Sequence, residues 1–322
     1  MRLRFFREVP NFDFFRWQWA TLGLSGVLVV LSLVAWGMIG LNFGIDFRGG
    51  TMIRTQSSQA VDVGQYRQAL APLELGDVSI AEVFDPTFAE DQHVAMIRIQ
   101  SQDGQESVNQ DTIAQIEAAL QGVDDTISFP LVESVGPKVS GELIWTAVLA
   151  VGASLAAILF YIWLRFEWQF SVGAVAALAH DVIVTIGIFS VLQIRFDLAT
   201  IAALLTIIGY SINDTVVIFD RLRENLVKFK TTPLRDLMNL TANETLSRTL
   251  MTSGTTLLAL IAMLVLGGDV IRGFIFAITW GVVVGTYSSV YVAKNIVLML
   301  GVKRDWSKPD NNQGNQFANV DA

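Results

Sequence analysis

The sequence predicts a helical membrane protein, with six transmembrane helices and one α+β domain inserted between the first and the second helix. Hydrophobic residues make up 52% of the 322 residues, and they are gathered into long blocks. A helix needs about 20 apolar residues to cross a bilayer, and six runs come near that length. We expect spans at 19–40, 143–164, 169–192, 198–219, 249–266 and 273–301. Residues 41–142 form the long polar stretch between the first two spans.

The N-terminal residues 1–18 combine arginines with aromatic side chains, which is typical of the cytoplasmic edge of a membrane. The first apolar run, 19–40, is too long for a cleaved signal peptide and lacks an obvious small-residue cleavage site. We therefore interpret this run as an anchor. The last residues, 302–322, are expected to form a disordered cytoplasmic tail.

The positions of the positive charges predict the orientation. Of the 22 lysines and arginines, 15 lie in the N-terminus, at residue 165, in 221–248 and in 294–308, which six alternating spans place on one side. Residues 41–142 instead hold 16 acidic and 5 basic residues. Positively charged loops tend to stay in the cytoplasm. Both termini are therefore expected to be cytoplasmic, and the acidic domain periplasmic.

Residues 41–142, called the external domain below, show the patterns of alternating strands and helices. Apolar alternation predicts strands, and the 3.6-residue spacing of Ile113, Ile116 and Leu120 predicts a helix. The expected strands are 50–55, 78–84, 93–100 and 126–131, and the expected helices are 62–70 and 109–120. This β-α-β-β-α-β order predicts a ferredoxin-like domain.

A glycine-rich motif opens the external domain. Its sequence is Gly44-Ile45-Asp46-Phe47-Arg48-Gly49-Gly50. Paired glycines before a strand are typical of a turn or bulge with positive φ. The residues favour a structural role, with a contact that moves during function as the alternative.

Asp214 lies inside the fourth expected span, several residues before its charged end. A carboxylate at the centre of a membrane helix costs roughly 2.5–3.5 kcal/mol, so such residues usually line a polar path inside the protein. Ser211 shares the helical face of Asp214, and Asn213 neighbours it on the next face. Asp214 is therefore the first candidate for a functional residue.

Two further polar groups lie at membrane depth. His180 and Asp181 are near the centre of the third span, where such pairs occur in proton relays but also in hydrogen-bond clusters that fix packing. Arg248 begins the fifth span and is followed by a hydroxyl-rich stretch that includes Thr252. An arginine near Asp214 would favour the ionised carboxylate, whereas burial would favour the neutral acid. The sequence leaves that balance open.

Several classes of function find no support in the sequence. The chain has no cysteine, and its two histidines, His93 and His180, lack metal-ligand spacing. There is no G-x-x-x-x-G-K-[ST] motif for nucleotide phosphates. We therefore expect no metal, cofactor or catalytic centre, no nucleic-acid partner, and membrane lipid as the main surroundings. The chain is not expected to be an enzyme.

Four motifs together resemble the SecF family, bacterial protein-export membrane subunits related to the RND transporters. They are the glycine-rich motif above, Ala177-Leu178-Ala179-His180-Asp181, Gly209-Tyr210-Ser211-Ile212-Asn213-Asp214-Thr215 and Ser247-Arg248-Thr249-Leu250-Met251-Thr252-Ser253-Gly254-Thr255-Thr256. The resemblance runs from the first span to the sixth, with the motifs in the family's order. It implies an RND-like half of six helices.

The resemblance implies a multi-pass protein of the bacterial cytoplasmic (inner) membrane that pairs with SecD and works beside the SecYEG channel and the SecA motor. There it would use the proton-motive force to help preproteins across the membrane, with an external domain that moves. It assigns proton transport to Asp214 and Arg248. The further candidates for the pathway are Asn213, Ser211, Thr252, Asp181 and His180.

Two alternatives stay open. Half of an RND-type small-molecule exporter would share an intramembrane carboxylate, but it should have larger external domains with an apolar substrate cleft. A non-transporting scaffold of the translocon would use its polar residues only to hold helices together, so that Asp214 and Arg248 would tolerate neutral polar replacement.

Overall fold

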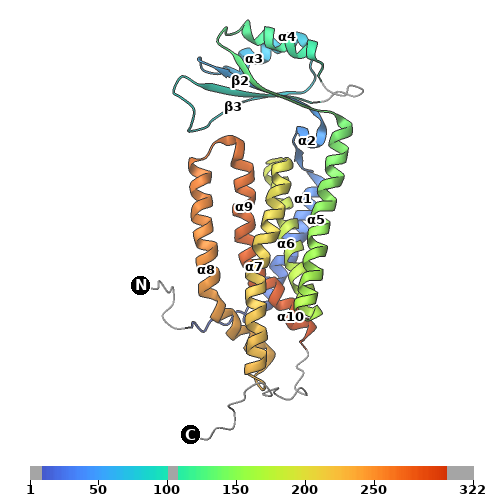
Figure 1. Ribbon diagram of the computed structural model, residues 1–322, viewed down its shortest axis with the longest axis vertical. Helices are drawn as coiled ribbons and strands as arrows, with labels where there is room; N and C mark the ends of the chain where they lie inside the picture. Colours follow the sequence, from blue (N-terminus) through green and yellow to red (C-terminus); the bar gives the residue numbers. More distant parts are fainter. Residues whose placement is uncertain (1–8, 101–107, 303–322) are drawn as a thin grey trace, which may run out of the picture.

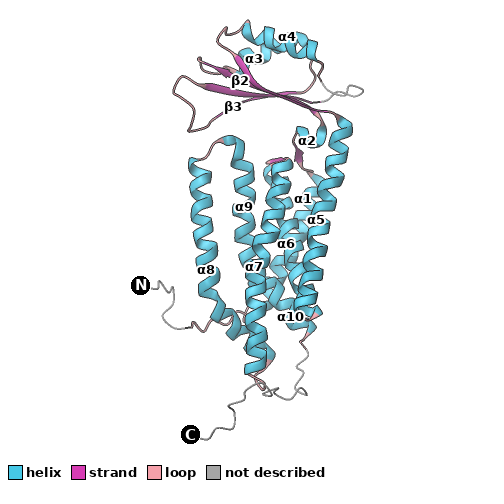
Figure 2. Ribbon diagram, in the orientation of Figure 1, coloured by secondary structure: helices cyan, strands magenta, loops and turns pink. Residues whose placement is uncertain are grey.

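The computed structural model describes residues 9–100 and 108–302. It consists of a long helical bundle with a smaller layer of sheet and helices at one end (Figure 1, Figure 2). Within the described ranges, six helices are long and apolar enough to cross a membrane. They are α1 (Gln18–Met38), α5 (Pro137–Arg165), α6 (Trp168–Leu192), α7 (Leu198–Lys228), α8 (Leu234–Leu266), and a last helix made of α9 (Asp269–Ser288), a π-helical turn (Ser289–Ala293) and α10 (Lys294–Leu300). Each expected span corresponds to one of these helices, whereas the expected tail after residue 302 lies outside the described residues.

Helix α6 lies at the centre of the bundle, packed against α1, α5, α7 and α9. Glycines allow two of the close contacts. A β-carbon on Gly187 of α6 would overlap the side chain of Ser32 on α1, and one on Gly281 of α9 would overlap Ile207 on α7. Because helices in lipid associate through close packing, small residues decide which helix faces can meet.

Two helices continue well past the apolar runs that predict them. Helix α7 continues beyond residue 219, and α8 begins before residue 249. The two extensions pack on each other through a buried apolar cluster, and the Asn225 side chain donates to Thr241 Oγ1 at 3.0 Å. Hydropathy detects the part of a helix that is apolar all round, and an amphipathic extension that packs on a neighbour is missed.

The external domain contains a four-stranded antiparallel sheet in the order β3-β4-β2-β5. Its elements are β2 (Gly50–Ser57), α3 (Val63–Leu70) with a 3-10 turn (Ala71–Leu73), β3 (Val78–Val83), β4 (His93–Gln100), α4 (Gln110–Gln121) and β5 (Ser128–Val135). This is the β-α-β-β-α-β order that the sequence predicts.

The last strand of the domain differs from its expected bounds, because β5 begins and ends later than 126–131. Thr126 belongs to a turn in which its amide donates to Asp124 Oδ1 at 2.9 Å. Downstream, Val135 still pairs with Gly50. The partner strand, rather than the local sequence, decides where β5 ends.

Helices α3 and α4 cover one face of the sheet, and the other face is turned toward the bundle (Figure 1). Successive strand residues point to opposite faces. Ile53 and Ile97 pack with the two helices in the core of the domain, whereas Met52 and Met96 line a cavity on the bundle side. The external domain therefore presents a partly apolar sheet face to the outer ends of the membrane helices.

Candidate functional site

Asp214 is buried about halfway along α7, where this helix meets α8 and α9, and only 3% of its surface is exposed. Among the described residues it accepts one hydrogen bond, from Ser253 Oγ of α8, at a long 3.5 Å. The same hydroxyl is shared with Thr286 Oγ1 of α9 at 2.7 Å. An ionised carboxylate has about four acceptor positions, so most of the acceptor capacity of Asp214 is unused.

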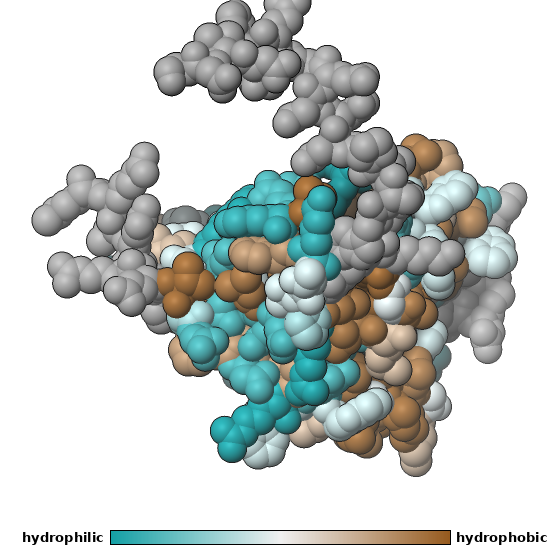
Figure 3. Space-filling view, turned by 90° about the horizontal axis from the view of Figure 1, so that it is seen from below, coloured by the Kyte–Doolittle hydropathy of each residue, from teal (hydrophilic) through white to brown (hydrophobic). Residues whose placement is uncertain are grey.

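Arg248 lies on α8, near enough for its charge to act on the Asp214 carboxylate. It makes no ion pair with Asp214 in the part of the chain that the structure describes. Its side chain lines a cavity of about 470 Å³ together with Asp220, Arg221 and Glu244. Hydrophilic side chains gather at this end of the bundle, opposite the external domain (Figure 3). Arg248 therefore stands between a polar cavity and a buried carboxylate.

Asp181 on α6 is fully buried and has three polar partners. Its Oδ2 accepts from Ser211 Oγ of α7 at 2.7 Å and from Ser288 Oγ of α9 at 2.8 Å. Its Oδ1 lies 3.0 Å from Nδ1 of His180. Asp181 thus joins three helices, and each of its two oxygens has at least one partner.

Ser211 has a different partner from the one that its helical face suggests. The spacing along α7 places it on the same face as Asp214, but its hydroxyl donates to Asp181. The Ser211 hydroxyl therefore binds Asp181, and no described hydrogen bond joins Ser211 Oγ to Asp214.

Asn213 and Thr252 are not brought into this cluster by hydrogen bonds. Asn213 is exposed on the outer side of α7. The Thr252 hydroxyl donates to the backbone oxygens of Arg248 and Thr249 in its own helix, at 3.0 Å each. Seven residues are expected at the site. Five of them are the two carboxylates or lie close to one of them, whereas Asn213 and Thr252 form no hydrogen bond with the cluster within the described residues.

The sequence reasoning missed two hydroxyls of the last helix, Thr286 and Ser288, that contact the site. Their signal was present in the small residues beside them, because Gly281 and Gly285 allow α9 to approach α7. A β-carbon on Gly285 would lie 3.0 Å from Ser211 Oγ and 3.5 Å from Asp181 Oδ2. Glycines at helical spacing next to hydroxyls thus mark the helix that reaches the buried carboxylate.

The histidine offers no metal centre in this arrangement. Among the described residues, no group of three or more His, Asp or Glu side chains is placed to hold a metal ion. His180 Nε2 is buried without a hydrogen-bond partner there, and the ring lies 6.3 Å from that of Tyr287, centroid to centroid. The arrangement can hold or pass a proton.

The glycine-rich motif forms the first attachment of the external domain to the bundle. Strand β1 (Asn42–Phe43) pairs in parallel with β6 (Arg195–Phe196), and the short helix α2 (Ile45–Arg48) follows. Asp46 Oδ2 accepts from the backbone amide of Leu198, the first residue of α7, at 3.0 Å. Phe47 packs on the rings of Phe43 and Phe196, with centroids 5.8 and 5.9 Å away.

The glycines of this motif have backbone roles. Gly44 donates its amide to Phe196 O at 2.8 Å, and a β-carbon there would lie 3.3 Å from that of Asp197. Gly49 and Gly50 have φ values of 75° and 129°, in the region that favours glycine, and they lead into β2. The expected turn with positive φ is confirmed. The motif fixes the start of the external domain to the start of the helix that carries Asp214.

A second attachment joins the β3–β4 hairpin to the turn between α8 and α9. The Phe84 amide donates to Asp269 Oδ2 at 2.9 Å, and the Asp269 amide donates back to Phe84 O at 2.9 Å. Gly268 lies so close to Asp85 that a β-carbon there would overlap the carboxylate. The external domain is therefore held at the outer ends of α7 and of the α8–α9 pair, the helices that surround Asp214.

Comparison with known proteins finds family matches for the helical bundle and for the glycine-rich motif. Residues 115–303 match the family described as "Protein export membrane protein SecD/SecF, C-terminal". Residues 34–61, which include the glycine-rich motif, match the "SecD/SecF GG Motif". Proteins named "Protein translocase subunit SecF" are similar over nearly their whole length. The one from Cereibacter sphaeroides is 66% identical over 100% of this chain and 99% of its own, and the one from Vibrio alginolyticus is 40% identical over 92% of each.

Solved structures described as SecDF have the same fold over most of this chain. SecDF from Thermus thermophilus, described as a translocon-associated membrane protein, is 35% identical with a TM-score of 0.78 over 90% of this chain. A super-membrane-facing form of SecDF is also 35% identical, with a TM-score of 0.69 over 93%. The chain spans only 39% and 40% of those two longer chains.

Proposed function

The chain belongs to the SecD/SecF family of protein-export membrane proteins, and we propose that it pairs with SecD and uses the proton-motive force to assist preprotein translocation. Its SecF relatives are named as translocase subunits, so its role is one of transport rather than catalysis. We place it in the cytoplasmic membrane beside the SecYEG channel and SecA. The external domain, with its ferredoxin-like connectivity, would then be periplasmic. The arginines at the opposite end of the bundle support that orientation.

The observation that carries the proposal is the state of Asp214. Its carboxylate is buried at membrane depth with one long hydrogen bond. Burial penalises the ionised form, while a nearby arginine favours it. Such a group changes charge with little rearrangement, because few hydrogen bonds have to be broken when a proton binds. A carboxylate with those properties is suited to bind a proton from one side and release it to the other.

The energy of one proton sets a limit on the mechanism. A proton that crosses 100 mV supplies about 2.3 kcal/mol, and one pH unit adds about 1.4 kcal/mol. Moving a two-state equilibrium from 1:99 to 99:1 takes about 5.5 kcal/mol. One proton therefore biases a movement of the external domain, and complete inversion needs a larger gradient or several protons.

The two attachments give that movement a physical route. When Asp214 is protonated, its attraction to Arg248 weakens, and α7 and α8 can repack. The outer end of α7 is bonded to Asp46, and the turn after α8 is bonded to Phe84. A shift between these two helices would therefore tilt the external domain about its attachments.

The outer face of α7 supports pairing of this helical bundle with a second membrane subunit. Thr206, Gly209 and Asn213 are exposed along one side of this helix at membrane depth, and a β-carbon on Gly209 would meet nothing in this chain. An exposed amide is unfavourable in lipid, and small residues allow close helix contact. We propose that SecD covers this face, since the longer SecDF chains contain more than this chain matches.

The test is preprotein translocation into vesicles that hold the assembled complex, with and without a proton gradient. Asp214→Asn should lose the gradient-dependent part completely, and Arg248→Met should lose most of it. Asp236→Asn removes the same charge from the neighbouring helix α8 at an exposed position outside the cavity that Arg248 lines and should behave like the native chain. If Asp214→Asn kept the full stimulation by the gradient in an intact complex, the polar residues would be packing groups and the chain a scaffold.

A further inference from the structure

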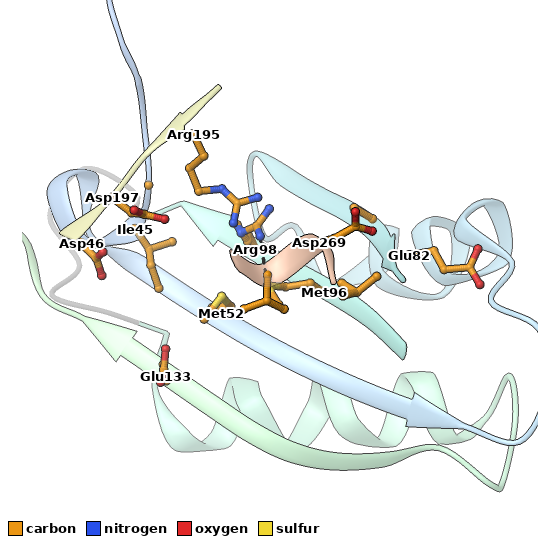
Figure 4. Close-up of a pocket in the computed structure, with 14 residues that line it drawn as sticks. Ile45, Asp46, Met52, Glu82, Met96, Arg98, Glu133, Arg195, Asp197 and Asp269 are labelled. Carbon is orange, nitrogen blue, oxygen red and sulfur yellow. Dashed lines mark hydrogen bonds between the residues drawn. The ribbon is translucent and has the colours of Figure 1, made fainter. Parts of the chain in front are cut away.

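A cavity of about 360 Å³ separates the open face of the sheet from the outer ends of the membrane helices (Figure 4). Residues from β2, β3, β4 and β5 line one side, and residues from α2, β6 and the start of α9 line the other. The cavity therefore lies between the two attachments described above and is distant from Asp214 along α7. Its volume is at the small end of the range of about 300–1,000 Å³ that is typical of ligand sites.

Two arginines from different parts of the molecule meet in this cavity. Arg98 comes from β4 of the external domain, and Arg195 comes from β6 of the bundle; Figure 4 shows their guanidinium groups next to each other. The Arg98 side chain donates to the sulfur of Met96 at 3.0 Å, which is a weak acceptor. Neither arginine forms an ion pair within the described ranges.

Among the described residues neither positive charge has a carboxylate in ion-pair contact, although Asp46 and Asp197 favour the charged form of Arg195 from a longer distance. Burial and the neighbouring Arg195 lower the pKa of Arg98 to about 10. Both side chains stay protonated near neutral pH, so two like charges are held together in a half-closed space. Like charges at short range repel, and a direct counter-ion would remove that cost.

The carboxylates that line the cavity make other contacts, and among the described residues none of them forms an ion pair with Arg98 or Arg195. Three of them accept from backbone amides: Asp46 from Leu198 at 3.0 Å, Asp197 from Thr200 at 2.9 Å and Asp269 from Phe84 at 2.9 Å. Two others, Glu82 and Glu133, lie apart from the guanidinium groups (Figure 4). These acids add a favourable field at longer range, but the donor groups of the arginines remain available.

We propose that this cavity binds a phosphate group, held between Arg98 and Arg195. Guanidinium groups bind phosphate through paired N–H donors in a fixed plane. Met52, Met96 and Val270 line the same space and would contact an apolar part of the ligand. A bound phosphate would add a further link between the external domain and the bundle, because each arginine belongs to one of the two parts.

Such a phosphate group has two sources, a soluble phosphate or the headgroup of an anionic phospholipid in the outer leaflet. Phosphorus NMR distinguishes them, with the full chain in a sugar-based detergent that contains no phosphorus. Inorganic phosphate is titrated in one arm, and short-chain phosphatidylglycerol in the other, with phosphatidylcholine as the zwitterionic reference. No proton gradient is present, so the result is independent of the proposed function.

We expect the native chain to broaden the phosphorus line of one or both anionic probes, and to leave phosphatidylcholine unchanged. Arg98→Gln and Arg195→Gln should each weaken binding at least about tenfold, because each removes a charge-assisted hydrogen bond. Arg67→Gln is the matched control, since it removes the same charge from an exposed position on α3 and should bind like the native chain.

The outcomes separate the sources and can overturn the site. Broadening of phosphate alone identifies a soluble anion, and broadening of phosphatidylglycerol alone identifies a headgroup. Arg195 is exposed, so Arg195→Gln tests the site even if Arg98→Gln fails to fold. No broadening by the native chain, or equal broadening by the native chain and Arg195→Gln, would show that the two arginines bind no phosphate group.

Discussion

The two carboxylates buried in the bundle, Asp181 and Asp214, differ in how many hydrogen-bond donors surround them. Asp181 receives short bonds from Ser211 and Ser288, at 2.7 and 2.8 Å, and lies beside His180. Asp214 receives one bond of 3.5 Å. The side chains are chemically identical and belong to adjacent helices, so the difference comes from the neighbouring helices.

We infer from this difference that Asp181 holds helices together and that Asp214 is the carboxylate that serves the proposed transport. Donors that point at a carboxylate stabilise its charged form and fix its position. Removing such a carboxylate leaves several buried donors without partners, whereas removing a carboxylate with one weak hydrogen bond leaves few donors unpaired. We therefore expect mutation of Asp181 to affect stability and mutation of Asp214 to affect transport.

The largest expected effect is on the free energy of unfolding. Asp181→Ala should lower it by about 2–4 kcal/mol, because two serine hydroxyls and a histidine lose their partner in a buried place. Asp214→Asn should change it by less than about 1 kcal/mol, because one long hydrogen bond is involved. Thermal unfolding of the detergent-solubilised chain measures both. Equal losses for the two variants would contradict the distinction.

A smaller effect tests how tightly each carboxylate is packed. Gly285→Ala should cost about 1–2 kcal/mol, since the added β-carbon would lie 3.0 Å from Ser211 Oγ. Gly254→Ala, next to Ser253 on α8, should be neutral or slightly stabilising, because a β-carbon there meets nothing within 4 Å. The same unfolding measurement checks both. A larger loss for Gly254→Ala would mean that the Asp214 side is as tightly packed as the Asp181 side.

The smallest effect concerns a well-bonded carboxylate outside the membrane. Ser57 and the turn at Thr126 donate to Asp124, and the Ser57 bond in particular lowers the pKa of this carboxyl group. A lowered pKa in the folded state gives stability that is present above the unfolded pKa and is lost as the pH falls through the folded value. Asp124→Asn should therefore cost less than about 1 kcal/mol at neutral pH.

The pH dependence gives the control for that variant. At about pH 3 the native chain should have lost part of the contribution, so the difference in unfolding temperature between the native chain and Asp124→Asn should shrink. A difference that stays constant between neutral and acidic pH would show that the hydrogen bonds of Asp124 do not depend on its charge.

The features that were predicted from the sequence are those that depend on neighbouring residues. The six spans follow from apolar runs, and the strand and helix order of the external domain follows from alternation and helical spacing. Asp181 and Asp214 stand out because a carboxylate inside an apolar run is energetically costly and therefore indicates a function or a polar contact inside the protein. The turn at Gly49 and Gly50 follows from the conformations that glycine favours.

The features that were missed depend on residues far apart in the chain. Helical spacing places Ser211 beside Asp214, but only the packing of α6 and α9 on α7 gives it Asp181 as its acceptor. In the same way, Lys294 is buried against the rings of Phe14 and Phe15, with its Nζ 4.7 and 4.3 Å from the ring centroids. No local pattern connects residues so distant in sequence.

The sequence by itself therefore determined the membrane spans, the folding pattern of the external domain and the two buried acids, because hydropathy and periodicity are local properties. The tertiary structure decided which acid has more hydrogen-bond partners, where the external domain is attached, and that Arg98 and Arg195 meet in one cavity. These facts depend on which helix faces and loops come together. That choice is made by shape and close packing over the whole chain, which a local pattern does not contain.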